Sequence, residues 1–175
     1  MNEINVIVWL LPILFILHDF EEIIMIKAWR KRYKNYLDTC KMRKKPYQDF
    51  QSTAEFSIGV EIIFVIFLII TVFTVIFNNY YVWYGFLFTF TAHFIVAHFN
   101  LCYRFKHYVP GVVTSILFLP LTIYLLFKAT ILLKFNLYQI IVSCIFTGII
   151  GYLIVIFLKS IEKYFEKLLI KFANK

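Results

Sequence analysis

FSIGVEIIFVIFLIITVFTVIF, residues 56–77, is an uninterrupted apolar run in which Glu61 is the only ionisable side chain. A helix needs about 20 predominantly apolar residues to cross a bilayer, so this segment predicts a transmembrane helix. Similar runs follow at 82–103, 110–131 and 137–158, and one precedes it at 5–26. The chain is 62% hydrophobic, which excludes an ordinary soluble domain. We therefore expect an all-α fold, with a single membrane domain over 1–175 and about five transmembrane helices.

The basic residues lie mainly on one side of these runs. The segments 27–55, 104–106 and 159–175 hold 16 of the 18 Lys and Arg residues, and the opposite side holds only Lys128 and Lys134. Because basic loops stay in the cytoplasm, we expect a multi-pass plasma-membrane protein with its N-terminus outside and its C-terminus in the cytoplasm. The net charge of +8 then indicates topology and attraction to anionic headgroups of the bilayer, and not nucleic-acid binding.

Two polar segments accompany the runs on the predicted cytosolic side. The basic segment 27–55 should contain a surface helix at about 30–40, and the tail 159–175 places a lysine at every fourth residue of an amphipathic helix. Within the first run, Pro12 removes one backbone donor. A proline can kink a membrane helix, since neighbouring helices can satisfy the carbonyl that it frees.

The first run also contains an unusual cluster, His18-Asp19-Phe20-Glu21-Glu22. A charge near the middle of a membrane helix costs at least ~2.5–3.5 kcal/mol, so such groups usually serve a function. His18, Glu21 and Glu22 share one helix face. An imidazole and two carboxylates on one apolar helix predict part of a divalent-metal site, or a proton-transfer cluster. Asp19 points ~100° away from His18, and we expect it to cap or to pair with a basic residue.

The predicted topology places ionisable groups from three helices at similar depths. At 1.5 Å per residue, His18 lies ~13 Å and Glu21 and Glu22 ~8 Å from the cytosolic surface. By the same rise Glu61 lies ~8 Å, His98 ~9 Å and His93 ~16 Å deep. His107 would cover this layer, and Thr114 and Ser115 would enter it from the fourth run. Such a layer predicts a shared site in the cytosolic half of the membrane.

His93 and His98 are the candidate partners of the first helix. They are five residues apart, so on an ideal α-helix they differ by ~140°. Both can face one site only if their helix is distorted or if the site lies between several helices. Which of His93, His98, His107 and Glu61 completes the cluster therefore stays open from the sequence.

The pentad His18 to Glu22 matches the signature of the small bacterial membrane proteins named for their HXXEE motif, and the chain resembles that family. The resemblance includes the basic segment, the histidine-bearing third run and Tyr108-Val109-Pro110-Gly111. It implies architecture and the importance of His18, Glu21 and Glu22, but no reaction. A weaker similarity is to the intramembrane CAAX-protease and bacteriocin-immunity group, through Glu21-Glu22 and the Phe94 to His98 segment. The arginine that follows the glutamate pair in that group is absent here.

The leading interpretation is a metal-dependent membrane enzyme. Zinc or iron held by His18, by Glu21 or Glu22, and by His93 or His98 would keep a position open for water. The other of Glu21 and Glu22 would act as the catalytic base. We expect hydrolysis of a lipid, isoprenoid or membrane peptide reached from the cytosolic leaflet. A proton- or metal-coupled transporter and a non-catalytic membrane partner or immunity protein are the alternatives.

Overall fold

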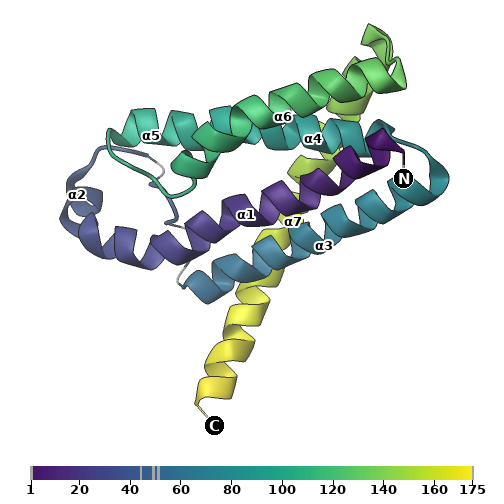
Figure 1. The fold of residues 1–175 in the computed structure, drawn as a ribbon. Helices are drawn as coiled ribbons and strands as arrows, with labels where there is room; N and C mark the ends of the chain where they lie inside the picture. The colour runs from purple at the N-terminus through teal and green to yellow at the C-terminus, as the bar shows by residue number, and fades with distance from the viewer. Residues whose placement is uncertain (1, 44, 49, 51, 175) are drawn as a thin grey trace.

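The structure is a computed structural model, and it describes residues 2–43, 45–48, 50 and 52–174. Every regular element in this part of the chain is a helix, as the sequence predicts (Figure 1). In chain order these are α1 (Glu3–Arg32), α2 (Lys34–Thr39), α3 (Thr53–Phe77), α4 (Tyr81–His93), the π-helix η1 (Phe94–Phe99), α5 (Asn100–Phe105), α6 (Val112–Leu133) and α7 (Leu137–Ala173).

Four helical segments are long and apolar enough to cross a membrane. They are α3, the continuous run of α4, η1 and α5 over Tyr81–Phe105, α6, and α7. These segments match four of the five predicted runs and confirm a polytopic membrane protein. The helix α1 is not among the four, so its span over 5–26 and the orientation of the chain stay predictions.

The helix α1 lies inside the bundle. It packs against α3 on one side and against α6 and α4 on the other (Figure 1). Val8 and Leu11 of α1 are fully buried and share one apolar core with Trp83 and Leu87 of α4. By contrast, α6 and α7 present large apolar side chains outward, as helices facing lipid do.

A hydrogen bond between helices compensates for Pro12 inside α1. Because proline has no N–H, the carbonyl of Val8 one turn earlier lacks its helical donor. The indole Nε1 of Trp83 donates to this carbonyl at 3.0 Å. A neighbouring helix thus satisfies the carbonyl that the proline frees.

The last helix, α7, is longer than the run that predicts it. It begins at a capping box formed by Asn136 and Gln139, and it continues without a break to Ala173. The segment 152–173 contains no glycine or proline to end it. Residues 159–173 of the predicted amphipathic tail are therefore the end of this long helix, which passes α4 and α3 and leaves the bundle toward the C-terminus (Figure 1).

Candidate metal centre

Two residues of α1 form the first half of the site. His18 and Glu22 are related as i and i+4, so they project from the same face of the helix toward η1. Both are buried, with 1% and 5% of their surface exposed. His18 Nε2 lies 3.7 Å from Glu22 Oε1. The sequence prediction that these two groups share a face is confirmed.

The π-helix η1 brings His93 and His98 together. In a π-helix each backbone N–H bonds to the carbonyl five residues earlier, so residues five apart return to nearly the same face. His93 precedes η1 and His98 lies within it. Their Nε2 atoms are 3.0 Å apart, although an ideal α-helix would separate them by ~140°. The sequence left open whether the helix that carries both histidines is distorted, and the structure shows that it is.

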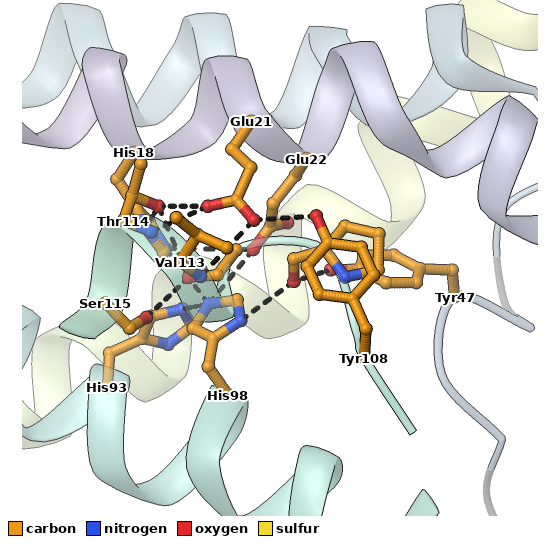
Figure 2. A network of polar contacts seen from close by, with 12 residues as sticks. His18, Glu21, Glu22, Tyr47, His93, His98, Tyr108, Val113, Thr114 and Ser115 are labelled. Carbon is orange, nitrogen blue, oxygen red and sulfur yellow. Dashed lines mark hydrogen bonds and ion pairs between the residues drawn. The ribbon is translucent and has the colours of Figure 1, made fainter. Parts of the chain in front are cut away.

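The two halves converge on one point (Figure 2). His98 Nε2 lies 3.0 Å from His18 Nε2 and 3.0 Å from Glu22 Oε1. Together with His93, these residues each offer one ligand atom, and the four atoms all lie within 4.8 Å of one another. At zinc bond lengths of about 2.0–2.1 Å, tetrahedral ligands are about 3.3 Å apart. The observed distances are thus close to those of a metal-binding group.

Two histidines have their second ring nitrogen held by an acceptor. His98 Nδ1 donates to the Pro110 carbonyl at 3.1 Å. His18 Nδ1 donates to Thr114 Oγ1 at 2.8 Å, because the Thr114 hydroxyl gives its own proton to Glu21 Oε2 at 2.6 Å. Hydrogen bonds of this kind orient ligating histidines and fix the tautomer in which Nε2 is free.

These tautomers leave a concentration of electron pairs at the centre. A neutral imidazole has one N–H and one lone pair. With Nδ1 protonated, the Nε2 lone pairs of His18 and His98 face each other at 3.0 Å, and a Glu22 oxygen approaches within the same distance. Such a group is repulsive unless a metal ion or a proton lies between its members. The donor set therefore fits a divalent metal ion.

Glu21 occupies a different place from Glu22. Its carboxylate accepts hydrogen bonds from the backbone N–H groups of Val113 and Thr114, at 3.3 and 2.8 Å, in the first turn of α6. Negative charge is stabilised at a helix N-terminus. Tyr108 donates a further hydrogen bond to Glu21 at 2.7 Å. Glu21 is therefore outside the group of ligand atoms. It is hydrogen-bonded to Thr114, and Thr114 is in turn hydrogen-bonded to His18.

Gly111 allows the close approach between α1, η1 and α6. It has φ +87°, a conformation that side chains with a Cβ rarely adopt. A Cβ at this position would lie 2.3 Å from His98 Cε1 and 2.6 Å from Glu22 Oε1. The glycine that the sequence places at the start of the fourth run therefore also borders the candidate metal centre.

Two tyrosines close the end of the site nearest the basic segments (Figure 2). Tyr47, from the segment between α2 and α3, donates to the Pro110 carbonyl at 2.8 Å. Tyr108 lies beside it and donates to Glu21. Burial, followed by the hydrogen bond to Glu21, raises the pKa of Tyr108, which keeps the phenol a donor. Sequence reasoning missed Tyr47, since nothing in its local pattern links it to the first helix.

Three other candidates lie outside the group of four. Glu61 is exposed on α3. His107 is also exposed, and its ring stacks on Tyr33. Asp19 is buried, and its Oδ2 has no hydrogen-bond partner within the part of the chain that the structure describes. The sequence predicts that Asp19 caps a helix or pairs with a basic residue. Among the described residues, its Oδ2 makes no such contact.

The four residues of the group differ in their exposure. His18, Glu22 and His98 are buried, whereas His93 is the exposed member of the group. Its Nε2 nevertheless points inward, toward His98.

Comparison with known proteins identifies the family. Searches of curated proteins and of solved structures found no match to this chain. These comparisons leave the weaker resemblance to the CAAX-protease group unconfirmed. A family profile described as "Protein of unknown function with HXXEE motif" matches residues 9–125, about two thirds of the chain. This range contains His18, Glu22, His93 and His98, and the chain belongs to the HXXEE-motif family.

Proposed function

We propose that the protein is a metal-dependent membrane hydrolase. The observation that carries this proposal is the convergence of three imidazole Nε2 atoms and one carboxylate oxygen within 4.8 Å. The fixed tautomers of His18 and His98 support it, because they direct lone pairs and not N–H groups at the centre. Buried ionisable groups in membrane segments are usually functional. Zinc and iron both accept imidazole and carboxylate ligands.

His18, His93 and His98 are the proposed ligands. Three histidines leave a fourth position for water, as in catalytic zinc sites. A metal ion bound there would supply Lewis-acid activation of water for hydrolysis. Glu22, whose Oε1 lies 3.0 Å from His98 Nε2, is the proposed general base, which would accept the proton that the attacking water loses.

Glu21 is proposed as a positioning residue. Its carboxylate holds the Thr114 hydroxyl, and that hydroxyl accepts from His18 Nδ1. The chain of hydrogen bonds fixes the ring of His18 and increases the basicity of its Nε2. The two glutamates of the motif would then have different tasks, although they are adjacent in the sequence.

The substrate would come from the bilayer. Tyr47 and Tyr108 close the site on the side of the basic residues, and His93 is the member exposed on the surface of the bundle. In a membrane-spanning bundle that surface contacts acyl chains. A lipid, an isoprenoid or a membrane peptide is therefore the proposed substrate class.

Metal analysis of the purified protein tests the centre. After exposure to zinc or iron(II) and removal of excess ion, the wild type should retain about one equivalent. His98→Ala should retain none, because three of the four donor atoms contact its Nε2. A wild type that binds no ion above the level of His98→Ala would overturn the proposal.

A pair of glutamate variants tests the role of Glu22. Glu22→Gln should keep the metal but should no longer hydrolyse phospholipids in liposomes. Mass spectrometry of the products measures this hydrolysis. Glu61→Gln makes the same chemical change at an exposed position outside the site and should keep both. If Glu22→Gln loses the metal, Glu22 is a fourth ligand and the proposed base must be abandoned.

A further inference from the structure

Two cavities lie next to each other near α2 and α5. Figure 1 shows these two helices at one end of the bundle. One, of about 520 Å³, opens between α2, the residues that follow it and the end of α5. The other, of about 810 Å³, opens between η1, α5 and the start of α6. Arg104 and Lys106 line both cavities. Both are shallow and widely open to their surroundings.

The shared wall is strongly basic. Lys41 and Arg43 line the smaller cavity together with Arg104 and Lys106, which gives four positive charges. Among the described residues that line the two cavities, none is acidic. A phosphate group is the natural counterion, because arginine and lysine both donate to its oxygens.

The larger cavity has an apolar side as well. Phe99, Tyr103 and Val112 line it beyond the basic pair, and Tyr103 is 83% exposed. This side continues onto the outward surfaces of the helix run Tyr81–Phe105 and of α6, both of which are apolar enough to span a membrane. A ligand that follows this surface needs a hydrocarbon chain next to its anionic group.

The basic end of the cavity is held in position by buried aromatic contacts. Trp29 and Phe105 are almost fully buried, and their rings lie 5.0 Å apart. Trp29 also donates to the Tyr108 carbonyl at 2.6 Å. Lys106, next to Phe105, ends α5 with φ +60°, and its N–H bonds to the Cys102 carbonyl. These contacts fix the backbone that carries Arg104 and Lys106.

We propose that the larger cavity binds an anionic phospholipid, with its phosphate at Arg104 and Lys106 and an acyl chain along Phe99, Tyr103 and Val112. The proposal does not depend on the metal centre, since none of the four donor residues lines the cavity. The two sites share only Tyr108, which lines the cavity and donates to Glu21.

Native mass spectrometry of the full-length protein in detergent provides the test. Phosphatidylglycerol should bind one site with higher affinity than phosphatidylcholine of the same acyl chains. Substituting Arg104→Gln and Lys106→Gln together should weaken phosphatidylglycerol binding on the order of ten- to thirtyfold. The matched control, Lys167→Gln with Lys171→Gln, removes the same charge from exposed positions on α7 and should change it less than threefold.

Three results would overturn the proposal. Equal loss in the two double variants would mean general attraction to the surface charge. Competition by inorganic phosphate at the same concentration as the lipid would mean an anion site without an acyl component. Equal affinity for phosphatidylglycerol and phosphatidylcholine would show that Arg104 and Lys106 do not select an anionic lipid. His98→Ala should bind phosphatidylglycerol as the wild type does, so a missing metal centre and a missing lipid site give distinguishable results.

Discussion

The Nε2 atoms of His93 and His98 lie 3.0 Å apart, and the π-helix between them makes this contact possible. A π-turn corresponds to one residue inserted into an α-helix. Such turns occur frequently at functional sites, because the extra residue shifts side chains that α-helical geometry would separate. The candidate metal centre depends on this local distortion.

Changing the length of the π-helix tests that dependence. Deleting Val96, which is 68% exposed, should convert the segment to α-helix with the two histidines at i and i+4, again on one face. We expect the deletion to keep metal binding. Inserting an alanine after Val96 should abolish it, because neither helical period then aligns the pair. The measurement is the amount of metal bound per protein. More metal in the insertion variant than in the deletion variant would contradict this account.

Gly111→Ala should disrupt the centre. The new methyl group would overlap His98 and Glu22, and the left-handed backbone adds strain of about 1–3 kcal/mol for a residue other than glycine. We expect a lower melting temperature in detergent and the loss of the bound metal. Gly148→Ala on α7 is the matched control, because its Cβ would meet no atom within 4 Å. Similar losses in both variants would argue against a special role of Gly111.

Thr114→Val should weaken the metal site without unfolding the protein. The substitution keeps the shape of the side chain but removes the hydroxyl between His18 and Glu21. Loss of such an outer hydrogen bond typically lowers metal affinity about 10- to 100-fold. Competition titration with a chromophoric chelator measures this. Thr122→Val, a buried threonine on the same helix, should leave the affinity unchanged.

Removing the metal should lower the thermal stability of the wild type. An ion bound only by the folded state adds about 2.7 kcal/mol to the free energy of unfolding at 100 times its Kd. A chelator should therefore shift the unfolding midpoint downward in the wild type, and addition of zinc or iron(II) should restore it. His98→Ala should show no such shift. A chelator effect of the same size in that variant would place the stabilising ion elsewhere.

Lowering the pH should also release the bound ion. Imidazole ligands bind metal only in their neutral form, so protons compete with the ion and apparent affinity falls as the pH is lowered. Metal retention measured as the pH is lowered should decline in the wild type. Thr114→Val should lose its ion at a higher pH, because its affinity is lower at the start. Identical release curves would contradict the proposed role of Thr114.

The apolar pattern predicted most of the fold because membrane helices are determined locally. Each run satisfies its own backbone hydrogen bonds, and its length matches the bilayer. The boundaries Thr53–Phe77 and Val112–Leu133 thus lie within a few residues of the predicted runs. The end of α7 was harder to place, since the change from apolar to amphipathic composition at Lys159 does not interrupt the helix.

The sequence by itself determined a helical membrane protein and the common face of His18 and Glu22, because both follow from composition and from the 3.6-residue period of one helix. Only the tertiary structure decided that His93 and His98 both point toward that face and that Glu21 turns to the start of α6. The same holds for the places of Gly111 and Tyr47 at the border of the site. These contacts connect residues up to 93 positions apart. They depend on how the helices pack, and no local period encodes that packing.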